Sequence, residues 1–161
     1  MEFKTATHEK VYEKTRQFLF EIFGEVNVTV IDDTFVLQEG STFVYVRVSA
    51  IGERQTCVEI FSYVVIDIEV NEALMCYLLG YNLKLVLGAF GLSIDDSGKG
   101  TIVLTHAILG DTMDKEELYA SVSAIARVAD NLDDEIVKTF GGKTALDKLN
   151  TPIAPVEYWE E

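Results

Sequence analysis

The segment from Asn71 to Gly142 constrains the fold of this chain more than any other part of the sequence. Its pattern predicts a short amphipathic helix, then an apolar β-hairpin, then one long helix. The long helix opens at GDTMDKEEL, where Asp114 and Glu117 have the spacing of a capping box. It ends at two glycines, after an apolar stripe that recurs every three or four residues: Leu118, Val122, Ile125, Ala129, Leu132, Ile136 and Phe140. A stripe this long, without complementary charges beside it, is typical of a helix that lies across a sheet.

The first helix and the hairpin of this segment carry their own signals. Asn71 is a suitable N-cap for a helix that ends near Tyr81 and buries a row of three leucines, Leu74, Leu78 and Leu79. Pairing across the DDSGKG turn predicts two pairs on one face of the hairpin, Leu92–Val103 and Phe90–Thr105. The other face then carries a trough in which small residues lie beside larger ones: Ala89, Gly91, Leu104 and His106. Such a trough lets a helix of the same domain, or another backbone, approach closely.

Ahead of this segment, the pattern predicts one helix and four strands. The helix covers residues 7–23, with Thr7 as its N-cap. The strands follow at about 26–31, 34–38, 41–50 and 56–66. In the last two strands, the alternation of apolar residues predicts a register in which the numbers of paired residues sum to 106. One face then holds branched aliphatic residues, in the pairs Val46–Ile60 and Val48–Val58, and should face the core.

The opposite face of these two strands is only half apolar, and it is the main candidate for a surface that contacts a partner. The predicted register brings together the pairs Phe43–Tyr63, Tyr45–Phe61, Arg47–Glu59 and Ser49–Cys57. We expect alternate residues from Phe43 to Tyr63 to supply pockets for a partner's side chains, while an edge strand supplies backbone hydrogen bonds. The trough of the hairpin is the second candidate surface.

The predicted elements follow the order α-β-β-β-β-α-β-β-α. They indicate an α+β fold, with a twisted antiparallel sheet and helices packed mainly on one face. We expect residues 1–142 to form a single domain. Residues 143–161 form a tail that either frays or docks on the domain.

Charge excludes several classes of partner. With 13 basic and 27 acidic residues, the chain has a formal net charge of −14 at pH 7. Phosphate backbones and anionic membranes repel such a chain, so we expect no nucleic-acid and no membrane partner. The acidity either keeps the protein in solution or attracts a basic partner. The sequence has no run of about 18 apolar residues, and we expect Cys57 and Cys76 to be buried free thiols in a reducing, cytoplasmic environment.

The motifs that carry chemistry are missing from the sequence. His8 begins HEKVY, which lacks the second histidine of a zinc-binding helix. His106 lies in the middle of a predicted strand, with no cysteine or second histidine nearby in sequence. Residues 95–98 have the composition of a turn rather than the spacing of a calcium loop. Residues 98–101 precede a strand, whereas a phosphate loop precedes a helix. We therefore predict no enzyme activity, no metal and no cofactor.

Residues 71–142 resemble the YbjN-like family, which is similar to type III secretion chaperones of the CesT kind. The matching phrases are NEALMCYLLGYNLKLVLGAFGLSID, GTIVLTHAILGDTMDKEEL and ARVADNLDDEIVKTFGG. The resemblance implies a compact α+β domain with a twisted antiparallel sheet, often paired as a homodimer. It also implies that the protein holds extended, partly unfolded segments of partner proteins in apolar grooves, as a chaperone or a regulator. It carries no catalytic residues.

Three functions fit the sequence. In the first, a non-enzymatic homodimer captures an extended segment of a client protein or peptide. In the second, the same apolar surface serves only to build a homodimer or a larger complex. In the third, the chain is a small-molecule sensor or an enzyme that uses His106 and scattered carboxylates. The resemblance and the lack of catalytic motifs favour the first function, although a fold alone does not fix a function.

Overall fold

The computed structural model describes residues 3–52 and 54–146. The helices are α1 (Ala6–Phe23), α2 (Glu72–Asn82) and α3 (Lys115–Phe140), with a short 3-10 turn, η1 (Glu25–Asn27), after α1. The strands are β1 (Val28–Ile31), β2 (Thr34–Glu39), β3 (Thr42–Ile51), β4 (Gln55–Glu69), β5 (Ala89–Ile94), β6 (Lys99–Leu109) and β7 (Lys143–Thr144). None of the described helices is both long and apolar enough to cross a membrane.

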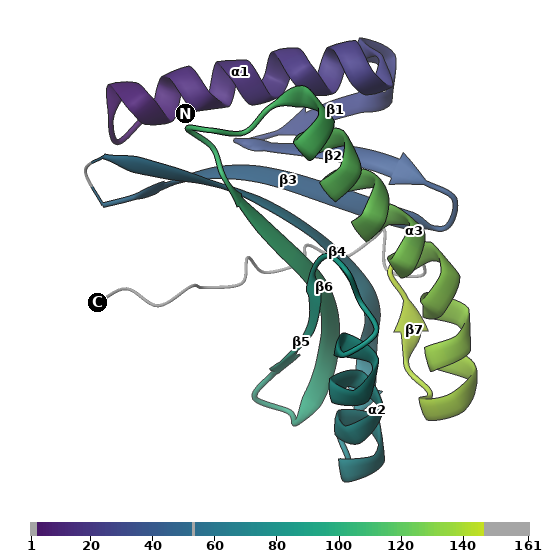
Figure 1. Cartoon of the computed structure of the whole chain (residues 1–161). Coiled ribbons are helices and arrows are strands. Elements are labelled where there is room, and N and C mark those ends of the chain that lie inside the picture. The colour runs from purple at the N-terminus through teal and green to yellow at the C-terminus, as the bar shows by residue number, and fades with distance from the viewer. Residues whose placement is uncertain (1–2, 53, 147–161) are drawn as a thin grey trace.

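The strands form one antiparallel sheet in the order β1-β2-β3-β4-β6-β5, so β1 and β5 lie at its two edges. The short β7 pairs with β4 at Val65 and Ile66, beyond the part of β4 that pairs with β3. Figure 1 shows α1 and α3 on the same side of the sheet, with α2 at the end where β5 and β6 lie. The predicted α+β fold, with an antiparallel sheet and helices mainly on one face, is confirmed.

The register predicted for β3 and β4 is also confirmed. The ladder pairs Val46 with Ile60 and Val48 with Val58, and these four side chains lie in the main core, at most 4% exposed. The ladder ends at the pair Tyr45–Phe61, so the further pair Phe43–Tyr63 is not part of it. Beyond that point, the hydroxyls of Thr42 and Ser62 lie 2.8 Å apart.

The predicted register of the β5–β6 hairpin is wrong by one residue. Phe90 pairs with Leu104 and Gly91 with Val103, so the paired numbers sum to 194 instead of 195. The cause is the turn. The Asp95 N–H donates to the Lys99 carbonyl, and Gly98 has a φ of +81°. These features are typical of a three-residue loop with a glycine in the left-handed region. Because side chains alternate between the faces of a strand, this shift of one residue changes which residues share a face.

The helices begin and end close to the predicted positions, with two corrections. The N-cap of α1 is Thr5 rather than Thr7, and its hydroxyl accepts from the His8 N–H at 3.0 Å. On α2, Asn71 caps the helix as predicted, but Leu79 is 67% exposed while Leu74 and Leu78 are buried. On α3, Asp114 is the N-cap, and the predicted stripe is buried from Leu118 to Ile136, with Phe140 half-buried at its end.

The two cysteines differ from the prediction. Both are free thiols, but Cys57 on β4 is only half-buried and Cys76 on α2 is exposed. Burial raises the pKa of the Cys57 thiol.

Two glycines in the left-handed region provide a matched test of how tightly α3 packs on the hairpin. A Cβ at Gly88 would lie 2.8 Å from Cδ1 of Ile125 and 2.9 Å from the Thr105 carbonyl oxygen, whereas a Cβ at Gly98 would meet nothing within 4 Å. Gly98→Ala should therefore cost only the backbone strain, about 1–2 kcal/mol. Gly88→Ala should lower the free energy of unfolding by about 1–3 kcal/mol more than Gly98→Ala does, because its added methyl group would overpack the core. Urea unfolding of both variants checks this, and equal losses would contradict the packing described here.

Candidate functional site

Three aromatic residues of the predicted partner surface lie together, on the face of the sheet opposite α1 and α3. The ring of Tyr45 stacks on Phe61 with centroids 5.3 Å apart, and Tyr63 lies edge-on to both rings. Phe61 and Tyr63 are only 7% and 5% exposed, because they pack with Val103 and with Ala145, which follows β7. The rings therefore form a second small apolar cluster. As a partner surface, this set of residues stays a prediction.

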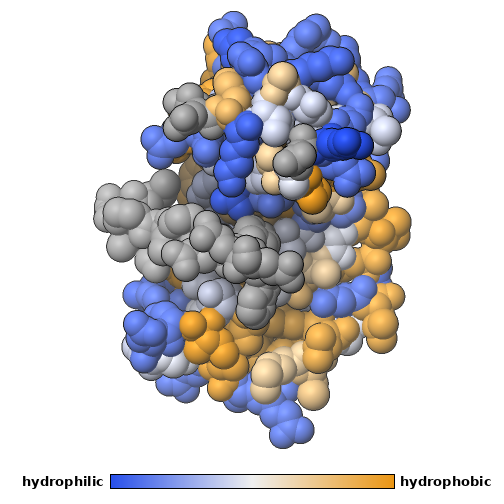
Figure 2. All heavy atoms as spheres, turned by 90° about the vertical axis from the view of Figure 1, so that its left-hand side faces the viewer, coloured by the Kyte–Doolittle hydropathy of each residue, from blue (hydrophilic) through white to orange (hydrophobic). Residues whose placement is uncertain are grey.

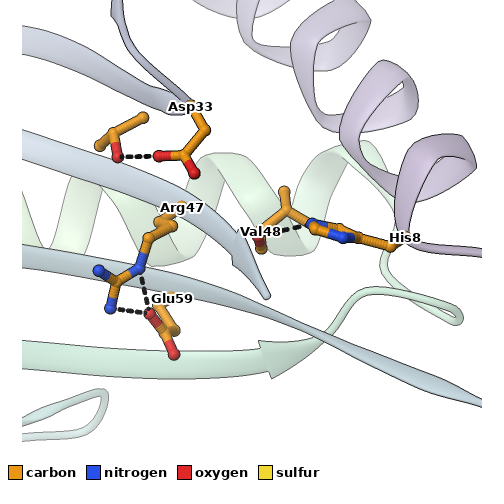
Figure 3. A network of polar contacts seen from close by, with 6 residues as sticks. His8, Asp33, Arg47, Val48 and Glu59 are labelled. Atoms are coloured by element: carbon orange, nitrogen blue, oxygen red, sulfur yellow. Dashed lines mark hydrogen bonds and ion pairs between the residues drawn. The ribbon is translucent and has the colours of Figure 1, made fainter. Parts of the chain in front are cut away.

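Arg47 of β3 and Glu59 of β4 form an ion pair on the same face of the sheet (Figure 3). Nε and Nη2 of Arg47 donate to Oε2 of Glu59 at 2.8 and 2.6 Å, and both side chains are largely buried, at 21% and 16% exposure. The guanidinium also lies 5.7 Å from the ring centroid of Phe61. Partial burial makes this cross-strand pair stronger than an exposed one, so it reinforces the register of β3 and β4.

The other predicted surface residues are divided between places. Ala89 and Gly91 pair with Thr105 and Val103, which pair in turn with Phe61 and Tyr63, so these two residues share the face of the aromatic cluster. Phe43 pairs with Gln38 of β2 and lines a hollow with Val36 and Thr29. The expected trough does not form, because the corrected register separates its members. Leu104 is buried in the main core, whereas the partner of Gly91 is Val103, which belongs to the aromatic cluster on the other face.

The histidines occupy structural positions in this geometry. His106 is half-buried near α3, and burial lowers its pKa, with Glu117 acting in the opposite direction. His8 is buried, and its Nε2 lies 3.0 Å from the Val48 carbonyl oxygen, which ties the start of α1 to β3 (Figure 3). Within residues 3–52 and 54–146, no three His, Cys, Asp or Glu side chains gather as metal ligands would.

A groove that the sequence did not reveal lies between α1, β2 and α3. It has a volume of about 590 Å³. Its floor consists of core residues of the sheet and α3, namely Leu37, Val44, Val122 and Ala126. Its apolar wall comes from the end of α1 and the start of α3: Ile22, Phe23 and Tyr119. Its rim is polar, with Asn27, Gln38, Glu39, Ser123, Arg127 and Asp130. An apolar floor with a polar rim suits a ligand that has both apolar side chains and hydrogen-bonding groups.

One rim of the groove is fixed by a polar network between α3 and the β2–β3 turn. Oδ1 of Asp130 accepts from the N–H and the hydroxyl of Ser41, at 2.6 and 2.9 Å. The same hydroxyl lies 2.8 Å from Oδ2 of Asp133, which is 2% exposed. A serine hydroxyl has one proton and cannot donate fully to two carboxylates. Burial raises the pKa of the Asp133 carboxyl, although the hydrogen bond with Ser41 opposes this effect.

The edge strand β1 runs beside the groove. Asn27, the residue before β1, lines the groove, and Val28 of β1 pairs with Leu37 of the floor. Apolar side chains at this edge are exposed, with Val26 at 94%, Val30 at 41% and Ile31 at 55%. An edge strand offers backbone donors and acceptors to which another extended segment can add.

Solved structures share this architecture. A chain in the crystal structure of the ExsC–ExsE complex matches with a TM-score of 0.55 and 18% identity, over 76% of this chain and 93% of that one. YbjN from E. coli, a proposed transcription regulator, matches with a TM-score of 0.50 and 12% identity, over 76% and 91% of the two chains. At these identities the likeness shows the fold alone. The chain therefore has the α+β fold of these two structures.

The family follows from the sequence. Residues 9–148 match the model of the TY-Chap1 family, described as type III secretion system (YopN, CesT) and YbjN peptide-binding chaperone 1. The chain belongs to this family. Among curated protein sequences, none matches it.

The rim network gives a pH-dependent prediction. The folded state binds the Asp133 proton more tightly than the unfolded state does, because the folded pKa is raised. The ionisation of Asp133 therefore lowers the free energy of unfolding as pH rises from about 4 through the folded pKa. Asp133→Asn removes this loss and can donate an amide N–H to Ser41. The variant should gain stability relative to wild type between pH 4 and pH 7.

Urea unfolding at several pH values measures this gain. Asp134→Asn removes the same charge from an exposed neighbour on α3 and should show a much smaller pH-dependent difference. A constant difference between Asp133→Asn and wild type across this range would contradict the account of the network.

Proposed function

We propose that this protein is a non-enzymatic, homodimeric peptide-binding chaperone or regulator, which holds an extended segment of a client protein in the groove between α1, β2 and α3. Membership in a family of peptide-binding chaperones supports the general role. The similar structure of ExsC with ExsE supports the choice of a protein as client. The observation that carries the proposal is the position of the groove beside the edge strand β1.

The chemistry of the groove suits an extended segment. A client strand added to β1 would satisfy backbone groups at this edge and place every second side chain on the helix-covered face. Phe23 and Tyr119, whose ring centroids lie 6.2 Å apart, form an aromatic contact between α1 and α3 that such side chains could pack against. Glu39 and Asp130 on the rim, together with the net charge of −14, favour a client segment with basic residues.

Filling the groove should block the client. Ser123 is half-buried on α3 and lines the groove, so the indole of Ser123→Trp would occupy the space of a client side chain. Ala120 is exposed on the same helix and does not line the groove, which makes Ala120→Trp a matched control. Peptides are first selected on the wild-type protein from a library of random 12-residue sequences. Their dissociation constants are then measured by fluorescence anisotropy.

We expect Ser123→Trp to weaken the selected peptides at least about tenfold, or 1.4 kcal/mol. The Ala120→Trp control should stay within about twofold of wild type. Two results would contradict the proposal that this groove binds the client. One is a library that yields no binding peptide, and the other is a Ser123→Trp variant that binds the selected peptides as tightly as wild type.

A further inference from the structure

A second hollow lies at the same edge of the sheet as the groove, on the face opposite the helices. Its volume is about 450 Å³. We call it the Phe43 hollow, and its lining comes from η1 and the first three strands: Val26, Thr29, Val36 and Phe43. In β2, Val36 directly precedes Leu37 of the groove floor. In β3, Phe43 directly precedes Val44 of that floor. Because successive side chains of a strand point to opposite faces of the sheet, the Phe43 hollow and the groove lie back to back.

The two cavities meet at the edge strand β1. Asn27, the residue before β1, and Gln38 of β2 line both of them. On β1 itself, Thr29 lines the Phe43 hollow, whereas its neighbour Val28 pairs with Leu37 of the groove floor. A strand that adds to β1 would direct its successive side chains, about 3.3 Å apart along the strand, alternately to the two faces of the sheet. One extended segment can therefore reach both cavities.

The two cavities differ in charge. The rim of the groove carries Glu39, Arg127 and Asp130, whereas all the residues that line the Phe43 hollow are uncharged. The lining of the hollow includes the ring of Phe43 and the exposed side chain of Val26. A charged side chain held against these two groups would lose water without gaining a partner of opposite charge, which costs free energy. The hollow therefore suits an apolar side chain.

We propose that the Phe43 hollow is a second client-binding site, which holds an apolar side chain of the same extended segment that lies in the groove. This inference rests on the proposed function and specifies the sequence pattern of the client. Residues that face the groove alternate in the client with residues that face the hollow, and the second set includes an apolar residue. A segment with charged residues at these alternate positions is rejected, so the edge is more selective than the groove alone.

Charges introduced at Val26 test the hollow on the full chain. The Val26 side chain is 94% exposed, so its replacement should leave the core intact, and far-UV circular dichroism with urea midpoints verifies this. Val26→Glu and Val26→Lys each place a charge in the hollow. We expect both variants to weaken peptides selected on the wild type about tenfold, measured by fluorescence anisotropy. A long-range effect of charge on a basic client would instead act in opposite directions in the two variants.

Val86 provides the matched control. Its side chain is 95% exposed in the loop between α2 and β5, and β5 is the edge of the sheet opposite β1. Figure 2 shows hydrophobic side chains gathered at the level of α2 and β5, whereas the level of α1 is mainly hydrophilic. Val86→Glu and Val86→Lys therefore make the same changes of charge on an apolar surface away from the hollow. Both should bind the selected peptides within about twofold of wild type.

Alanine substitutions along a selected peptide test whether the two cavities contact alternate residues. For each peptide position, a double-mutant cycle measures the coupling of the alanine substitution with Val26→Glu and, separately, with Ser123→Trp. The positions coupled to Val26→Glu should alternate with those coupled to Ser123→Trp, because the side chains of a strand alternate between its faces.

Three outcomes would overturn the proposal. The first is unchanged peptide binding by both Val26 variants, and the second is coupling of the same peptide positions to Val26→Glu and to Ser123→Trp. The third is a Val26 variant whose mass by light scattering differs from that of wild type, since the hollow would then be a contact between copies of the chain. If Ser123→Trp weakens the peptides while the Val26 variants do not, the proposed function stands and only the hollow fails. The reverse result would refute the groove, and with it the alternating pattern.

Discussion

The packing of α3 on the central strand β4 is the contact on which the rest of the structure depends. Leu118, Ile125 and Ile136 of α3 are fully buried, as are Val58 and Ile60 of β4. Each such side chain contributes about 1.5–3 kcal/mol when it leaves water. Because β4 pairs with β3 on one side and β6 on the other, α3 holds both halves of the sheet at once. The hydrogen bonds of Ser41 with Asp130 then tie the β2–β3 turn to the same helix, and this sets one rim of the groove.

The periodicity of apolar residues was sufficient to predict those elements in which only one face can be buried. The stripe of α3 and the alternation in β3 and β4 each allow one buried face, so their faces and register follow from the residues. The β5–β6 hairpin did not offer this constraint. The segment DDSGKG contains two glycines, either of which could have formed the turn. Gly98 adopts the left-handed conformation that closes a three-residue loop, whereas Gly100 in β6 pairs with Ile94 of β5, so the paired numbers have an even sum. Leu79 was misplaced because α2 is apolar on more than one side.

The candidate site was harder to predict, for a physical reason. The aromatic row was visible in the sequence, because Tyr45 and Phe61 are paired by a regular ladder. Ala145 packs on these aromatic rings. This contact depends on the path of the chain after α3, and no local sequence pattern specifies that path. The groove joins residues that are distant in the chain, such as Phe23, Leu37 and Ser123. Ile22 and Phe23 at the end of α1 are apolar, but the sequence alone does not distinguish such residues from ordinary core residues. The predicted tail begins at residue 143, and its first two residues form β7, which pairs with β4. The rest of the tail, residues 147–161, lies outside the described residues.

The central claim is that a client segment binds in the groove and adds to the edge of β1. Hydrogen exchange of individual backbone amides, followed by NMR with and without a selected peptide, tests it most directly. Bound peptide should slow exchange in Val28–Ile31 and leave Ala89–Ile94 unchanged, because an added strand protects the amides that it pairs with. Protection confined to β5, or to β4 around Phe61 and Tyr63, would place the client elsewhere and contradict this account.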